Sequence, residues 1–235
     1  MTDMTPPAAP SATSSSNSSA PLTQSDGTRY IVLVHGLGRT KYDMLLMARR
    51  LKRRFPHDRI LAFGYPTRSG GIANHAQRLQ WFIEHEVPKG ANLHFVCHSL
   101  GSLVVRATAG GLQEAYSLGR AVLLGPPNQG AITARALGRF ALPRKIFGPT
   151  LNEIGALTAP PATDLLDIGI LAGCTGIPIG FTPLLPGDND GLVLLKETYL
   201  PGAIEHKRVF MHHTIMPFSA RMARLAANFI ETGRF

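Results

Sequence analysis

Short apolar runs alternate with longer segments of helical periodicity from residue 30 onward, and this alternation restricts the possible folds more than any other feature. Each run contains several aliphatic residues, and most end at a glycine, a proline or a histidine, which is typical of buried strands. The predicted strands are residues 30–34, 59–66, 92–97, 120–125, 167–173 and 207–212. Strands that alternate with helices predict an α/β fold with a mostly parallel central sheet and helices on both faces.

Four segments between or after these runs have apolar residues at the spacing of an amphipathic helix. In residues 41–55 the apolar stripe is accompanied by five basic residues at the remaining positions, which predicts a solvated basic face. The third helix starts at Leu100, and Gly110 with Gly111 predicts a break or kink in it. The stripes are Met44, Met47, Ala48, Leu51 and Phe55; Ile72, Ala76, Leu79 and Ile83; Leu100, Leu103, Val104 and Ala107; and Ile215, Phe218, Met222, Leu225 and Phe229.

Two segments depart from this pattern. Residues 1–28 are rich in Ser, Thr, Pro and Ala and predict a disordered tail before a single domain at 29–235. Residues 126–163 contain PPNQG, a basic stretch and a Pro/Thr/Ala stretch, and they predict a small irregular cap or lid. Its mixed apolar and basic residues leave two interpretations open: a surface for an acyl chain or lipid, or a solvated cap.

Composition limits the class of protein further. No signal-peptide pattern and no uninterrupted apolar run of about 18 residues is visible, so we expect a cytoplasmic protein. Cys97 and Cys174 lie in apolar surroundings and are expected to be buried free thiols. The net charge of +9 favours anionic partners. The basic helix lacks interleaved aromatic residues, so we expect no nucleic-acid partner.

The sequence VCHSLG at 96–101 places Ser99 between a predicted strand and a predicted helix. The pattern is close to Gly-x-Ser-x-Gly, which marks a nucleophilic serine on a tight strand-to-helix turn, although Cys97 stands where the first glycine is usual. The alternative is a serine that caps the helix. A nucleophilic serine requires a base to remove its proton and an acid to orient that base.

Candidates for both partners follow later predicted strands. GDNDGLV supplies Asp188 and Asp190, of which Asp190 is favoured, while a turn role remains the alternative for each. His212 and His213 follow the last strand; we favour His213 as the base and place His212 at the strand end. An oxyanion would need two backbone N–H donors, for which Leu37 in HGLG and Leu100 are the candidates, and His35 is expected to shape the HGLG loop.

These motifs together resemble the serine hydrolases of the α/β-hydrolase superfamily, within its lipase and esterase group. The resemblance runs from about residue 30 to the end of the sequence. It implies Ser99 as nucleophile, Asp190 as acid, His213 as base, and the Leu37 and Leu100 N–H groups as the oxyanion hole. The motifs that carry it are VLVHGLGR, VCHSLGSLVVR, LLGPPNQG, GDNDGLV and HHT.

The expected reaction is carboxylester hydrolysis through an acyl-serine intermediate, which requires no cofactor and no metal. The substrate would be a small-molecule or lipid ester, and peripheral contact with a lipid surface is left open. An acyltransferase or a thioesterase would use the same triad. The alternative from another class is a non-catalytic protein that binds anions or lipid. Acyl length and oligomeric state are not determined by the sequence.

Overall fold

The computed structural model describes residues 28–157 and 164–235. Its centre is a six-stranded sheet with the order β2-β1-β3-β4-β5-β6, and every neighbouring pair is parallel. The strands are β1 Arg29–Val34, β2 Arg59–Phe63, β3 Asn92–His98, β4 Ser117–Leu124, β5 Asp167–Cys174 and β6 Glu205–Phe210. All six predicted strands are present, and the carboxyl ends of these parallel strands lie at one edge of the sheet.

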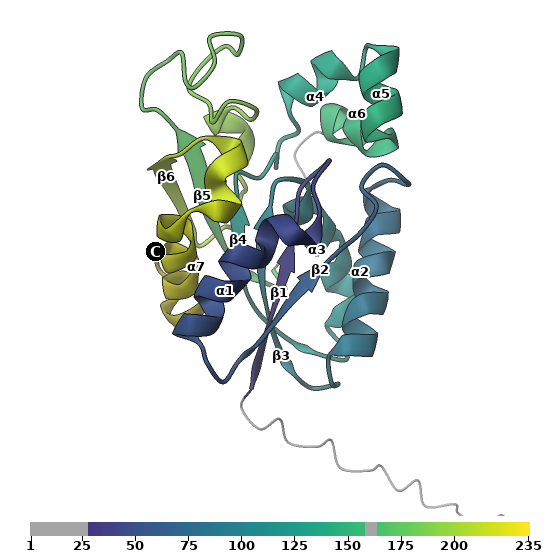
Figure 1. Cartoon of the computed structure of the whole chain (residues 1–235), viewed down its shortest axis with the longest axis vertical. Helices are drawn as coiled ribbons and strands as arrows, with labels where there is room; N and C mark the ends of the chain where they lie inside the picture. Colours follow the sequence, from purple (N-terminus) through teal and green to yellow (C-terminus); the bar gives the residue numbers. More distant parts are fainter. Residues whose placement is uncertain (1–27, 158–163) are drawn as a thin grey trace, which may run out of the picture.

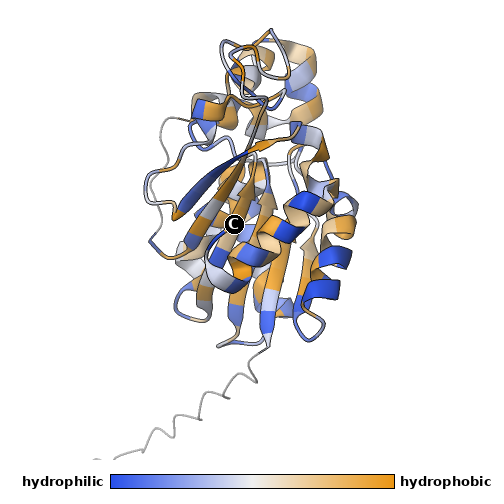
Figure 2. Ribbon diagram, turned by 90° about the vertical axis from the view of Figure 1, so that its left-hand side faces the viewer, coloured by the Kyte–Doolittle hydropathy of each residue, from blue (hydrophilic) through white to orange (hydrophobic). Residues whose placement is uncertain are grey.

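Helices cover both faces of the sheet, as predicted (Figure 1). Helices α1 (Leu45–Arg54) and α7 (Ala220–Thr232) pack on one face, and α2 (Ile72–Glu86) and α3 (Leu100–Leu112) on the other. Successive residues of β1 point to opposite faces. Ile31 accordingly belongs to the core cluster beneath α1 and α7, and Val32 to the cluster beneath α2 and α3. In Figure 2 the strands are mostly in the hydrophobic colours, whereas the covering helices carry hydrophilic bands.

The cap, defined here as residues 132–156, differs from its prediction. It consists of three short helices, α4 (Ile132–Leu137), α5 (Ala141–Phe147) and α6 (Pro149–Ala156), instead of an irregular segment. Each has six to eight residues, too few for a clear helical period in the sequence, and Gly138 and Gly148 separate them. Residues 158–163 of the predicted cap lie outside the described residues, as do residues 1–27 of the predicted tail.

Three short 3₁₀ segments complete the chain: η1 (Lys41–Met44), η2 (Leu195–Thr198) and η3 (His213–Phe218). The predicted break or kink at Gly110 and Gly111 falls in the last turn of α3, which continues one residue farther, to Leu112. The Gln80 side chain of α2 lies beside Gly111 and donates to its carbonyl at 3.5 Å. Cys97 and Cys174 are buried free thiols, as predicted. Across the two described ranges, every helix is too short or too polar to cross a bilayer.

Candidate active site

Ser99 lies on the tight turn between β3 and α3. Its backbone has φ 52° and ψ −120°, and it is the sole residue other than glycine with positive φ in the described part of the chain. Such a conformation costs about 1–3 kcal/mol and persists only where the surrounding structure enforces it. Its side chain makes no capping hydrogen bond to α3, so the helix-capping alternative is wrong.

Packing explains Gly101, two residues after Ser99, and Cys97, two residues before it. A Cβ atom at Gly101 would lie 2.5 Å from the carbonyl oxygen of Val34, so only glycine lets α3 start so close to β1. Cys97 has room because its side chain points into the core cluster beneath α2 and α3. Complete burial raises the pKa of the Cys97 thiol far above its usual range. Cys97 is therefore a core residue and not a competing nucleophile.

Asp190 and His213 form a buried pair at the carboxyl edge of the sheet. Nδ1 of His213 lies 2.7 Å from Oδ2 of Asp190, and the backbone N–H of His213 donates to the Asp190 carbonyl at 2.8 Å. The other carboxylate oxygen of Asp190 accepts the N–H groups of Leu192 and Val193. Because this carboxylate can only accept, Nδ1 of His213 carries the proton and Nε2 is left with a free lone pair.

Asp188 and His212, the alternatives to Asp190 and His213, make other contacts. Asp188 accepts the N–H groups of Thr175 and Gly176 and thereby closes the loop after β5. His212 was expected at the end of the last strand, but β6 ends at Phe210 and His212 lies in the following loop. There it forms the N-cap of η3, and its Nδ1 contacts Thr214.

His98 contacts His213 from the opposite side to Asp190. Its Nε2 donates to the backbone carbonyl of His213 at 3.0 Å, and the ring centroids lie 4.7 Å apart. Burial, and then the proximity of His213, hold the pKa of His98 well below its usual range, so its ring is neutral at pH 7. In the sequence, His98 is notable only as the residue before Ser99. Its role depends on a contact between residues 115 positions apart.

The HGLG loop is held by His35, as expected. Nδ1 of His35 donates to the Gly36 carbonyl, and its ring stacks on Tyr65 at 4.4 Å between centroids. The N–H of Gly38 is used internally, since it donates to Thr67. In contrast, the N–H groups of Leu37 and Leu100 donate to no other group of residues 28–157 or 164–235.

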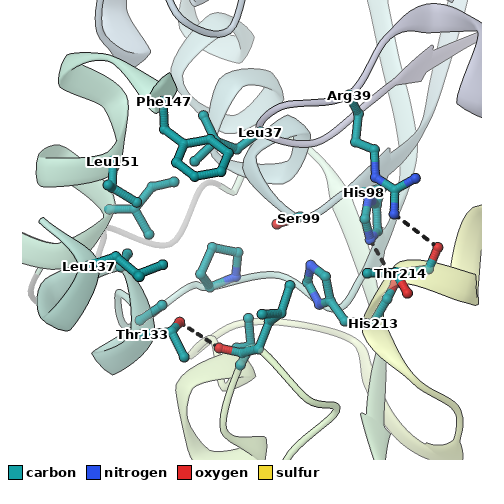
Figure 3. Close-up of a pocket in the computed structure, with 16 residues that line it drawn as sticks. Leu37, Arg39, His98, Ser99, Thr133, Leu137, Phe147, Leu151, His213 and Thr214 are labelled. Carbon is teal, nitrogen blue, oxygen red and sulfur yellow. Dashed lines mark hydrogen bonds between the residues drawn. The ribbon is translucent and has the colours of Figure 1, made fainter. Parts of the chain in front are cut away.

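Ser99 and His213 border one cavity of about 180 Å³ between the cap and the carboxyl edge of the sheet (Figure 3). The cap side of the cavity is apolar, and polar groups gather at the end near Ser99. Of the apolar residues of the predicted cap, Ala134, Leu137 and Phe147 line the cavity, whereas Phe140, Leu142 and Ile146 are exposed. The remaining apolar residues of its lining include Leu37, Leu151, Ile154, Leu192 and Val193.

Two contributors to this site have only weak sequence signals. Arg39, the residue after HGLG, lines the cavity, pairs with Asp43 and donates to the carbonyl of Thr214. Gly125, with φ 54°, follows β4 and passes directly beside Asp190 and His213. A Cβ atom there would lie 2.9 Å from Oδ2 of Asp190 and 3.0 Å from Nδ1 of His213. Only a glycine fits beside the pair at this point.

Residues 24–128 match the family model described as "Putative serine esterase (DUF676)". That range contains Ser99 and ends before Asp190 and His213. None of the curated proteins matches the sequence.

Solved structures show the same fold at low identity. The mature lipase BlEst2 of Bacillus licheniformis is similar with a TM-score of 0.65 and 19% identity, over 92% of this chain and 96% of that chain. The metagenomic carboxyl esterase MGS0156 is similar with a TM-score of 0.61 and 17% identity, over 89% and 77%. The RedJ thioesterase of Streptomyces coelicolor is similar with a TM-score of 0.56 and 16% identity, over 96% of both chains.

The family match over residues 24–128 supports a serine hydrolase activity. The chain has the α/β-hydrolase fold of known lipases and esterases.

Proposed function

We propose that this protein is a serine carboxylester hydrolase with Ser99 as nucleophile, His213 as base and Asp190 as the acid that orients the base. One observation carries the proposal: the strained turn at Ser99 and the Asp190-paired His213 border the same small cavity. A serine forced to positive φ, without a capping role, that lines the same cavity as a histidine of defined tautomer supports nucleophilic catalysis.

The reaction follows from these groups. The Ser99 hydroxyl attacks the ester carbonyl while Nε2 of His213 takes its proton, and the tetrahedral oxyanion accepts the N–H groups of Leu37 and Leu100. The C–O bond to the leaving group then breaks, and His213 protonates the departing alcohol. Water attacks the acyl-serine with His213 again as base, which releases the carboxylic acid and restores the serine hydroxyl. Asp190 holds the His213 ring and stabilises its charged form throughout.

The cavity indicates the acyl side of the substrate. Its volume of about 180 Å³ is below the roughly 300–1,000 Å³ of pockets for drug-sized ligands. Apart from Thr133, whose hydroxyl donates to the Leu192 carbonyl, its lining on the cap side is aliphatic and aromatic, with no charged group at that end. We therefore expect a short to medium acyl chain in the cavity, with the leaving group toward Arg39 and the solvent.

The test is hydrolysis of p-nitrophenyl esters whose acyl chains span acetyl to palmitoyl, with wild-type protein and Ser99→Ala. We expect measurable kcat/KM in the wild type, highest for short to medium chains, and a loss of about 10⁶-fold in kcat for the variant. Ser102→Ala is the matched control, because Ser102 lies one residue beyond Gly101 and is fully buried in α3. Equal rates for wild type and Ser99→Ala would exclude the proposed nucleophile.

The same triad would also cleave a thioester, and one structural neighbour is a thioesterase. Parallel assays with acyl thioesters of the preferred chain length separate the two substrates. We expect the oxygen ester to have the higher kcat/KM. A higher kcat/KM for the thioester would make the thioester the proposed substrate, with Ser99 still as the nucleophile.

A further inference from the structure

The positive charge of this protein is concentrated on one face. Residues 39–54 and 219–232, called here the basic face, hold nine of the 24 lysines and arginines but only two of the 15 aspartates and glutamates. Both acidic residues are paired, Asp43 with Arg39 and Glu231 with Arg54. On the opposite face, α2 and the turn after it balance Arg78 and Lys89 against Glu84 and Glu86. The basic face therefore carries a net charge of +7, most of the +9 of the whole chain.

Helices α1 and α7 lie side by side on this face (Figure 1). Residues of both helices line a groove. The groove has a volume of about 470 Å³. Its apolar lining is made of small residues, Ala220, Ala223 and Ala227, and its cationic lining is Arg50, Arg53, Arg54 and Arg224. Arg53 and Arg224 make no ion pair or hydrogen bond with the described residues, so two uncompensated cations border one groove.

Exposed apolar side chains lie between this groove and the active-site cavity. They come from η1, α1 and η3, which pack against one another. Phe218 links the two regions, because Arg50 of the groove donates to its carbonyl and the guanidinium of Arg39, which lines the cavity, lies 5.8 Å from its ring centroid. The exposed apolar residues are Tyr42, Leu45, Leu46, Ile215 and Phe218.

We propose that the basic face is a docking surface for anionic phospholipid membranes, with lipid phosphates at the α1–α7 groove and the exposed apolar side chains in the interfacial layer. Cations next to aliphatic side chains on a surface helix are typical of proteins that lie on a membrane. Each Lys or Arg near an anionic leaflet is attracted to it, so a face with nine basic residues and two acidic ones favours an anionic membrane over a neutral one.

The basic face fits a nucleic-acid partner less well than an anionic membrane. A groove for single strands needs aromatic side chains on which bases stack, and the apolar lining of this groove is alanine. Three of the five neighbouring exposed apolar residues are aliphatic and offer no ring on which a base can stack, whereas the hydrocarbon of a membrane would bury their apolar surface. The proposal does not rest on the catalytic one, since docking needs neither Ser99 nor His213.

The experiment uses the full chain with the Ser99→Ala substitution as the parent protein. It measures co-sedimentation with vesicles of phosphatidylcholine alone or of phosphatidylcholine with about 30% phosphatidylserine. The test variant is Arg53→Glu/Arg224→Glu. Arg78→Glu/Lys89→Glu, which makes the same charge change on the α2 side, is its matched control. A third variant, Leu45→Ser/Leu46→Ser, removes exposed apolar groups without a change in charge. Thermal melts by circular dichroism verify that each variant folds, and Arg53→Gln/Arg224→Gln replaces the test variant if it does not.

We expect at least about tenfold tighter binding to the anionic vesicles, a preference that high salt weakens. The Arg53/Arg224 variant should lose this preference, and the Arg78/Lys89 control should keep most of it. The Leu45/Leu46 variant should bind vesicles more weakly but bind a single-stranded oligonucleotide as the parent does. Equal binding to both vesicle types, or equal losses in the Arg53/Arg224 variant and its control, would overturn the proposal. Tighter binding to the oligonucleotide than to anionic vesicles would assign the face to nucleic acid instead.

Discussion

The hydrogen bond between Asp190 and His213 determines which ring nitrogen can accept a proton. Asp190→Asn would offer an amide N–H or a carbonyl to Nδ1, and it favours the tautomer with the proton on Nε2. We predict a fall in kcat of about 10³–10⁴-fold with little change in KM for p-nitrophenyl esters. Steady-state kinetics at pH 7.5 test this prediction.

Asp188→Asn is the matched control, because Asp188 is two residues away and accepts backbone N–H groups of the β5 loop. It should lower the melting temperature by a few degrees and leave kcat within about tenfold of wild type. A larger loss of kcat in Asp188→Asn than in Asp190→Asn would reverse the assignment of the acid.

At the scale of single residues, the sequence predicts which residues belong to the candidate site better than it predicts their contacts. Ser99 could be singled out because Gly101 and the strand before it are local features. The choice between His212 and His213 depended on where β6 ends, and strand ends are set by pairing with β5 across the sheet. The hydrogen bond from His98 to the His213 carbonyl had no local signal, because the two segments meet only in the folded chain.

The three short helices of the cap place Phe147 over the HGLG loop. A Cβ atom on Gly38 would lie 3.1 Å from the Phe147 ring, so this ring closes the cavity next to Leu37 and Gly38. Helix α5 has no buried residue, whereas α6 buries Leu151 and Ile154, so the cap is anchored mainly through α6. Periodicity did not predict these helices, because each spans only two turns or fewer.

Phe147→Ala should therefore enlarge the cavity with little loss of stability. We predict that the preferred acyl chain becomes longer, with kcat/KM rising about fourfold for each methylene that the larger cavity can bury. Phe140→Ala is the matched control, because Phe140 lies in the same cap and is 64% exposed outside the cavity. The measurement is kcat/KM as a function of acyl-chain length, with p-nitrophenyl esters, for both variants and wild type. An identical profile for wild type and Phe147→Ala would show that this ring does not limit the acyl chain.

The whole molecule keeps several histidines buried, and this property should make its stability depend on pH. His94 in β3 is the clearest case, since burial, and then the charges of Arg29 and Arg120, lower its pKa to about 4. The unfolded chain has the ordinary pKa of about 6.5 and binds a proton more readily than the folded chain between these values. The folded state is therefore fully favoured above pH 6.5 and loses stability as pH falls toward 4.

We predict that this group alone lowers the free energy of unfolding by about 2 kcal/mol between pH 7.5 and pH 5. Urea unfolding at both pH values measures this change in the free energy of unfolding. The change should be smaller in His94→Gln than in wild type. His57→Gln, which changes an exposed histidine, should leave it unaltered. A wild-type difference that His94→Gln does not reduce would contradict the assignment.

At the scale of the whole fold, the sequence was a reliable guide. Six apolar runs predicted six strands, because a parallel sheet buried on both faces needs continuous apolar segments such as residues 30–34. The same argument placed the HGLG loop, the Ser99 turn and the Asp190 and His213 loops at one edge. The groove between α1 and α7 could not be foreseen, because periodicity shows that a helix has a basic face and not which helix lies beside it.

The central claim is that Ser99 is the nucleophile, and labelling with a fluorophosphonate tests it most directly. The reagent phosphonylates activated serines, and intact mass followed by peptide mapping locates the adduct. The account predicts one adduct per chain, on the peptide that contains Ser99, slower labelling in His213→Ala and none in Ser99→Ala. A folded protein that stays unlabelled, or an adduct on another serine, would contradict the account.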